Sequence, residues 1–170
     1  MPPHAPLPDE VDRIVSGWTQ VRPDLDPQPM AVLSRISRLA RHLEGARRAA
    51  FTASGIEGWE FDVLSALRRA GGTPLSPGAL VQQTLVTSGT MSTRLEKLEA
   101  RGLVARSRDP HDGRSVRVSL QPAGERLVDE AMRRLLDWER AVLSALDEPE
   151  QQHLADTLRV LLQTFENDAR

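Results

Sequence analysis

The fold is decided by residues 87–120, which read TSGTMSTRLEKLEARGLVARSRDPHDGRSVRVSL. Met91, Leu95 and Leu98 recur there at the spacing of one buried helix face, so the sequence predicts a helix over residues 88–101. After that helix the apolar period changes from helical to alternating, and Asp-Pro and Asp-Gly turn dipeptides separate two short apolar runs. The stretch therefore predicts a helix that leads directly into a two-stranded β-hairpin.

A second short helix is predicted just before this stretch, over residues 77–85, with a tight turn between the two. Two short helices joined by a turn and followed by a hairpin form a winged helix-turn-helix. The second helix of such a unit fits the major groove of DNA and presents side chains to base edges. The expected fold class is mainly α with a small β-hairpin wing. Further amphipathic helices are predicted over residues 9–21, 30–53, 59–70, 122–145 and 148–166.

Polar and basic residues occur where such a fold would meet DNA. Small residues at the start of helix 88–101 leave backbone N–H groups open to a phosphate, and polar residues lie opposite its apolar face. On the hairpin, Arg114 at the tip is expected to enter the minor groove, with Asp112 holding its guanidinium, while two strand arginines meet phosphate. The predicted DNA-contacting residues are Ser88, Gly89, Thr90, Thr93, Lys97, Arg108, Asp112, Arg114 and Arg117.

The distribution of charge supports a polyanionic partner. The chain of 170 residues has a formal net charge of −2. However, residues 91–117 hold seven Lys or Arg against four Asp or Glu, whereas residues 123–170 hold six against eleven. A local basic face favours double-stranded DNA even when the whole chain is acidic. Two alternatives stay open: a basic hairpin that is simply solvated, and a winged-helix module that binds protein.

Several other classes of function are disfavoured by what the sequence lacks. It has no cysteine, which excludes disulfides, thiol sensing and Cys-based zinc sites. It has no phosphate-cradling glycine loop and no GxSxG elbow, so an enzyme is not expected. Its four histidines are scattered, and neither a metal nor a cofactor is expected. No apolar run approaches membrane-spanning length and the first residues lack a secretion signal, so a cytoplasmic protein is expected.

Two segments resemble a known family. DPHDGRSVRVSLQPAGERL resembles the wing and following helix of the MarR family of bacterial transcription regulators, and LEKLEARGLVAR resembles the end of that family's recognition helix. The resemblance covers about residues 9–167 and departs at Gln121, where the family usually has a Thr cap. It implies a homodimer in which the terminal helices interlock and two winged lobes bind a pseudo-palindromic operator.

The apolar stripes of the terminal helices support a homodimer independently, because they exceed what one small lobe could cover. The alternative is a monomeric helical bundle joined to the lobe. The chain is thus expected to form one domain. Its expected parts are a tail over residues 1–8, dimerisation helices over 9–53 and 122–167, and a winged lobe over 57–120.

The predicted helix 9–21 resembles an extra element in the urate-responsive branch of the MarR family. That branch places a Trp, an Asp and two Arg around its effector, and the matching residues here are Trp18, Asp62, Arg94 and Arg106. Urate is a flat monoanion, so an indole, a carboxylate and two guanidinium groups suit it chemically. The resemblance implies a regulator, most simply a repressor, that urate or a related purine releases from DNA.

Each of these four residues also has a purely structural interpretation. Trp18 lies on the apolar stripe of its helix and could pack in the core, and Asp62 could be an exposed carboxylate. Arg94 could contact phosphate, and Arg106 could contact phosphate or form an ion pair. Another small organic anion, or a phenolic or antibiotic compound, is the alternative effector.

Overall fold

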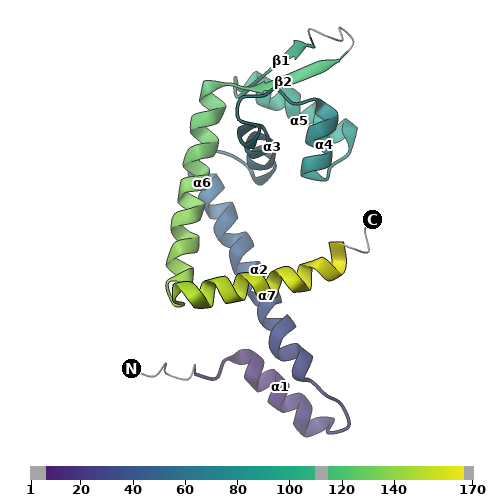
Figure 1. Cartoon of the computed structure of the whole chain (residues 1–170), viewed down its shortest axis with the longest axis vertical. Coiled ribbons are helices and arrows are strands. Elements are labelled where there is room, and N and C mark those ends of the chain that lie inside the picture. The colour runs from purple at the N-terminus through teal and green to yellow at the C-terminus, as the bar shows by residue number, and fades with distance from the viewer. Residues whose placement is uncertain (1–6, 110–114, 167–170) are drawn as a thin grey trace. The chain divides into compact units, whose positions relative to one another are not determined.

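The computed structural model describes residues 7–109 and 115–166. Within those residues the chain forms seven helices and one antiparallel hairpin, α1-α2-α3-α4-α5-β1-β2-α6-α7 (Figure 1). The predicted fold class is therefore confirmed, and each helix lies within two residues of its predicted bounds. The chain divides into two compact units, Met1–Arg48 and Ala49–Arg170, so the boundary falls inside α2.

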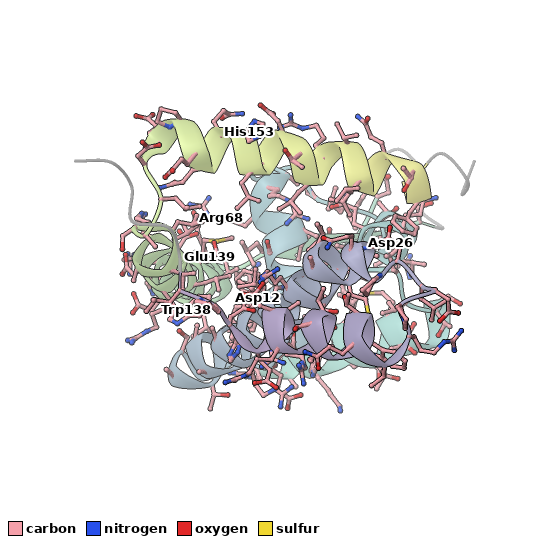
Figure 2. The ribbon with its side chains drawn as sticks, turned by 90° about the horizontal axis from the view of Figure 1, so that it is seen from below. Asp12, Asp26, Arg68, Trp138, Glu139 and His153 are labelled. Atoms are coloured by element: carbon pink, nitrogen blue, oxygen red, sulfur yellow. The ribbon has the colours of Figure 1, made fainter. Side chains whose placement is uncertain are left out.

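The first unit contains α1 (Glu10–Val21) and most of α2 (Gln28–Ala53). Asp9 caps α1 by accepting hydrogen bonds from the backbone N–H groups of the first turn. Arg35 of α2 donates Nε to Asp9 Oδ2 at 2.9 Å and Nη2 to Asp12 Oδ1 at 2.8 Å (Asp12 is labelled in Figure 2). The hydrogen bond from Arg35 also lowers the pKa of Asp9. One arginine thus joins the start of α1 to α2.

The second unit contains the winged lobe. Its helices are α3 (Gly58–Arg69), α4 (Pro77–Thr84) and α5 (Ser88–Ala100). The wing consists of β1 (Val104–Arg108) and β2 (Val116–Leu120), which pair antiparallel. Pro at the first position of α4 suits a helix start, because the missing N–H would have no partner inside the helix.

The wing is attached to the helices by backbone hydrogen bonds. Val104 lies opposite Leu120, and Arg108 lies opposite Val116. Leu75, in the connection between α3 and α4, then adds a third segment beside β2: its N–H donates to Val118 O at 3.0 Å, and Val118 N–H donates to Leu75 O at 2.8 Å. The outer edge of β2 is therefore fixed to the lobe at the base of the wing.

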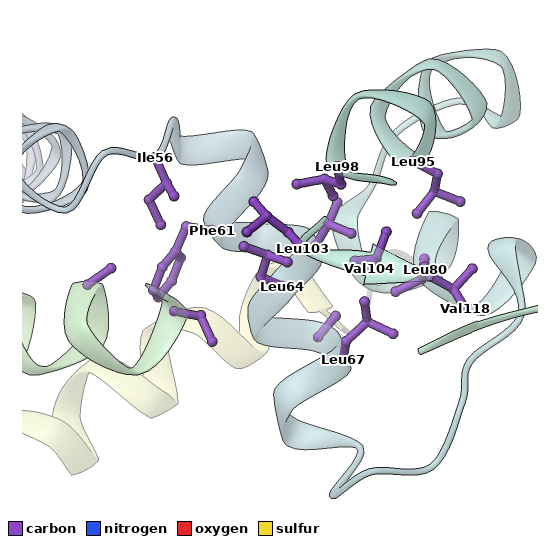
Figure 3. Packing of buried hydrophobic residues seen from close by; sticks show 14 of the residues in the cluster. Ile56, Phe61, Leu64, Leu67, Leu80, Leu95, Leu98, Leu103, Val104 and Val118 are labelled. Atoms are coloured by element: carbon purple, nitrogen blue, oxygen red, sulfur yellow. The ribbon is translucent and has the colours of Figure 1, made fainter. Parts of the chain in front are cut away.

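The core of this unit lies where α3, α4, α5 and the hairpin meet (Figure 3). Met91, Leu95 and Leu98 are 0%, 1% and 0% exposed, which confirms the predicted buried face of α5. Leu64 of α3 and Val118 of β2 are also fully buried and belong to the same cluster. Burial of α5 on one face leaves its opposite face in solvent.

Two long helices follow the wing: α6 (Pro122–Leu143) and α7 (Glu148–Glu166). As expected, the side chain of Gln121 makes no capping hydrogen bond to α6. A capping box begins α7 through two 2.9 Å bonds, Asp147 N–H to Glu150 Oε2 and Glu150 N–H to Asp147 Oδ1. The apolar side chains of α7 are largely exposed: Leu154, Val160, Leu161, Leu162 and Phe165.

Candidate nucleic-acid interface and effector site

The recognition helix α5 begins with an exposed, unobstructed turn. Thr87 is the N-cap: its Oγ1 accepts from Thr90 N–H at 3.3 Å and lies 2.9 Å from the Thr90 hydroxyl. Ser88 and Gly89 precede Thr90 and are exposed, and no atom lies within 4 Å of where a Gly89 side chain would start. The first two N–H groups of the helix lie at the positive end of the helix dipole, where a bound phosphate is favoured.

The solvent face of α5 carries the other predicted groups. Thr93 and Lys97 are exposed, on the side opposite the buried stripe. The Thr93 hydroxyl donates to Gly89 O at 3.4 Å, a long bond that a base edge or phosphate could replace. This face therefore offers one hydroxyl and one ammonium group to a major groove.

The two strand arginines of the wing differ in their surroundings. Arg108, at the end of β1, is exposed. Arg117 donates Nε to Asp109 Oδ2 at 2.6 Å, and Asp109 is only 7% exposed. Arg117 thus holds the wing together by an ion pair, and only its remaining N–H groups could reach a phosphate. Asp112 and Arg114 lie outside the described residues.

Arg106 is held by an acidic residue of α5. Its Nε and Nη2 donate to Glu99 Oε2 at 2.8 and 2.6 Å, and its backbone N–H donates to Glu99 Oε1 at 3.1 Å. These hydrogen bonds lower the pKa of Glu99 and raise that of Arg106. Arg106 also lines an open groove of about 350 Å³ between α5 and the wing, together with Ser92 and Arg108. An anion that binds Arg106 must compete with Glu99.

Arg94 contacts an aromatic residue that the sequence did not single out. Its guanidinium carbon lies 5.4 Å from the ring centroid of Trp59, at cation–π distance. The Trp59 indole N–H donates to Glu57 Oε2 at 2.6 Å, which orients the ring. Asp62 is exposed and lies one turn after Trp59 on α3. In the sequence, only its position three residues before Asp62, on the same side of the predicted helix, connects Trp59 with the predicted effector residues.

The remaining predicted effector residue is Trp18 in α1, which belongs to the other compact unit. Trp18 is 46% exposed in the single chain, so its apolar stripe is not fully buried there. Of the four predicted effector residues, Asp62 and Arg94 lie on helices of the lobe, and Arg106 lies in the wing.

A buried carboxylate anchors the far end of α5. Glu60 is 3% exposed, accepts from Glu57 N–H at 2.9 Å, and accepts from Arg101 Nη1 at 2.5 Å. Arg101 also donates Nη2 to Gly55 O at 3.0 Å. The end of the recognition helix is therefore tied to the start of α3. Sequence analysis missed this pair because Glu60 looks like an ordinary first-turn acid.

The described residues contain no candidate metal site and no membrane-spanning helix. There, no group of three or more His, Asp or Glu is placed to hold a metal ion. His153, labelled in Figure 2, lies on α7 and is exposed. No helix in the same described ranges is long and apolar enough to cross a bilayer.

Comparison with known proteins gives consistent matches. A family model described as MarR family matches residues 54–115. The HTH-type transcriptional regulator PecS of Dickeya dadantii (strain 3937) is 34% identical over 146 residues, covering 85% of this chain and 88% of PecS.

Two solved structures extend the comparison. BpsR of Bordetella bronchiseptica, whose DNA binding is regulated by 6-hydroxynicotinic acid, is 30% identical with a TM-score of 0.57, covering 75% of this chain and 98% of BpsR. YusO from Bacillus subtilis shares the fold with a TM-score of 0.67 at 20% identity, covering 81% of this chain and 96% of YusO. The chain belongs to the MarR family of transcription regulators, which are DNA-binding proteins and not enzymes.

Proposed function

We propose that this regulator binds a pseudo-palindromic operator as a homodimer and represses transcription until a small planar anion releases it. The observation that carries the DNA part is the exposed start and outer face of α5, with Thr93 and Lys97, next to the exposed Arg108 of the wing. In a dimer, two such lobes would read major grooves about 34–36 Å apart, one helical turn of DNA.

The homodimer is supported by apolar surface that a single chain leaves in water. On α2, Val32, Leu33 and Leu39 are exposed, and α7 exposes Leu162 and Phe165. Contiguous apolar surfaces of this kind mark protein interfaces. Because both helices carry such surface, a second copy of the chain is the simplest partner to cover it.

The proposed effector is urate or a related purine, bound by Trp18, Asp62, Arg94 and Arg106. The support is chemical: guanidinium groups pair with anionic or carbonyl oxygens in a planar fork, and a carboxylate can accept ring N–H bonds. Arg94 also lies on the recognition helix. An effector that pulls Arg94 away from Trp59 would therefore change the presentation of α5, and the affinities for DNA and effector would be coupled reciprocally.

A second candidate effector is a hydroxylated pyridine carboxylate. BpsR, at 30% identity, has its DNA binding regulated by 6-hydroxynicotinic acid. This compound is also a flat anion with a ring N–H, so the same four side chains would suit it.

The test is a mobility-shift titration with the full-length protein. A duplex is first selected by the protein from a random-sequence pool, and urate, xanthine, hypoxanthine and 6-hydroxynicotinic acid are then added separately. A purine should weaken operator binding, and Arg94→Ala should abolish that response while the protein still binds DNA. If only 6-hydroxynicotinic acid acts, the purine assignment is wrong. If no duplex is selected even at low salt, the operator-binding proposal is wrong.

A further inference from the structure

The turn between α4 and the recognition helix contains a residue whose conformation and exposure are both unfavourable. Leu85 follows α4 with φ 53° and ψ 39°, a left-handed backbone conformation. It is the only residue other than glycine with positive φ in the described part of the chain. Its side chain is 92% exposed.

Neither property is needed for the turn itself. A left-handed residue ends a helix most easily when it is glycine, because a Cβ atom clashes with the backbone in that region. The core contacts of the turn are made by the next residue, Val86, which packs against the buried cluster. A glycine at position 85 would thus satisfy the backbone and would remove an apolar side chain from water. Backbone strain that the fold does not require points to a functional role.

The position of Leu85 indicates what that role is. It lies two residues before Thr87, the N-cap of α5, and the exposed residues Ser88 and Gly89 follow directly. The side chain is therefore continuous with the candidate DNA interface. An operator duplex offers two kinds of apolar group near a recognition helix: thymine C5-methyl groups at base edges, and deoxyribose rings beside the phosphates.

We propose that Leu85 is a DNA-contacting residue that packs against a thymine methyl or a deoxyribose of the operator. This inference rests on the proposed operator binding. Contact with DNA removes the Leu85 side chain from water. The free energy gained by this burial compensates for the strained backbone. The contact is apolar, so it adds affinity without neutralising a phosphate.

The test compares three variants of the full-length protein on the selected duplex. Leu85→Gly and Leu85→Asn both tolerate the left-handed backbone but remove the apolar side chain. Each should weaken operator binding by about tenfold, as expected when part of a leucine is no longer buried. Leu85→Met retains apolar bulk and should bind within about twofold of wild type. The Tm of Leu85→Gly should be no lower than that of wild type.

Two further measurements separate Leu85 from other roles. The slope of log affinity against log salt should be unchanged in Leu85→Gly, because no counterion-releasing contact is lost. Replacing operator thymines by deoxyuridine removes only the methyl groups. If this weakens wild type but not Leu85→Gly, the contact is a thymine methyl; if it changes neither, the contact is a deoxyribose.

Three outcomes would overturn the inference. Wild-type affinity in both Leu85→Gly and Leu85→Asn would show that DNA does not cover the side chain. A loss of affinity that accompanies dissociation into monomers, measured by sedimentation, would assign Leu85 to a subunit contact. If the wild-type chain selects no duplex, the operator-binding proposal fails first and this inference fails with it.

Discussion

Glu60 illustrates how one buried carboxylate can hold the recognition helix in place. It caps the start of α3 and pairs with Arg101 at the end of α5. Replacing Glu60 by Gln keeps a hydrogen-bond acceptor but leaves Arg101 without its charged partner.

We expect Glu60→Gln to lower the free energy of unfolding by about 1–2 kcal/mol, since Arg101 is partly exposed and can be rehydrated. Urea denaturation measures this change. Glu96→Gln is the matched control, because Glu96 is an exposed acid on the same recognition helix, and it should leave stability within about 0.5 kcal/mol of wild type. Equal stability of both variants would mean that the buried pair contributes nothing.

Gly124 is required by close backbone packing and not by its backbone angles. A Cβ atom at this position in α6 would lie 2.3 Å from Leu103 O and 2.9 Å from Leu120 Cδ1. The carbonyl oxygen cannot move away easily, because Leu103 O accepts the hydrogen bond of Gln121 N–H at 3.0 Å.

Gly124→Ala should therefore destabilise the protein by about 2 kcal/mol or more, in the range of other overpacked sites. The control is Gly45→Ala in α2, where no atom lies within 4 Å of the added Cβ. Because alanine is the better helix former, that control should stabilise the chain by up to about 1 kcal/mol. Thermal unfolding of both variants should shift Tm in opposite directions, and a parallel shift would contradict the packing argument.

For the secondary-structure elements, local sequence signals were sufficient because each has a local cause. The buried face of α5 follows from the spacing of Met91, Leu95 and Leu98. The start of α7 follows from the reciprocal bonds between Asp147 and Glu150. Helix periodicity and capping act over three or four residues, so a sequence carries them directly.

Contacts between elements were harder to predict, and they decide the candidate site. Periodicity places Arg94 at the edge of a buried face, but it does not say that Trp59 of α3 lies beneath it. Likewise, the sequence leaves phosphate, an effector and an ion pair open for Arg106, and only the folded chain shows that it pairs with Glu99. Both partners depend on how α3, α5 and β1 pack against one another, and helix periodicity does not reveal that packing.

The phosphate contacts proposed for α5 and for the wing can be tested through the salt dependence of DNA binding. Lys97 and Arg108 are exposed, whereas Arg117 is engaged with Asp109. If Lys97 and Arg108 each neutralise one phosphate, replacing either by Ala should lower the slope of log affinity against log salt by about one.

Arg159→Ala is the control, because Arg159 lies on α7 and pairs with Asp156 far along the sequence from the wing. This variant should leave the slope unchanged. Fluorescence anisotropy on the selected duplex at several salt concentrations gives the slopes. Unchanged slopes for both Lys97→Ala and Arg108→Ala would place the phosphate contacts on other residues.

For the molecule as a whole, the unequal exposure of apolar residues connects the two parts of the proposed function, DNA binding by the lobe and dimerisation by the other helices. The winged lobe buries its own core, with Leu64 and Leu80 at 0% exposure, whereas α7 leaves Leu162 59% exposed. The lobe is therefore complete in one chain, and the helices beyond it are not. Reading two half-sites would require the incomplete part to join two complete lobes.

Leu162→Glu tests this division, because it places a charge in the proposed subunit interface and leaves the lobe unchanged. The unpaired buried charge should shift the protein to monomers in sedimentation velocity at micromolar concentration, while far-UV circular dichroism stays helical. Operator affinity should fall by about 100-fold or more, since linking two lobes raises avidity by that order. His153→Glu adds the same charge nine residues before Leu162, on the opposite side of α7 at about 100° per residue, and should leave both the dimer and its affinity intact. A Leu162→Glu protein that stays dimeric and binds normally would mean that α7 covers its apolar face in some other way.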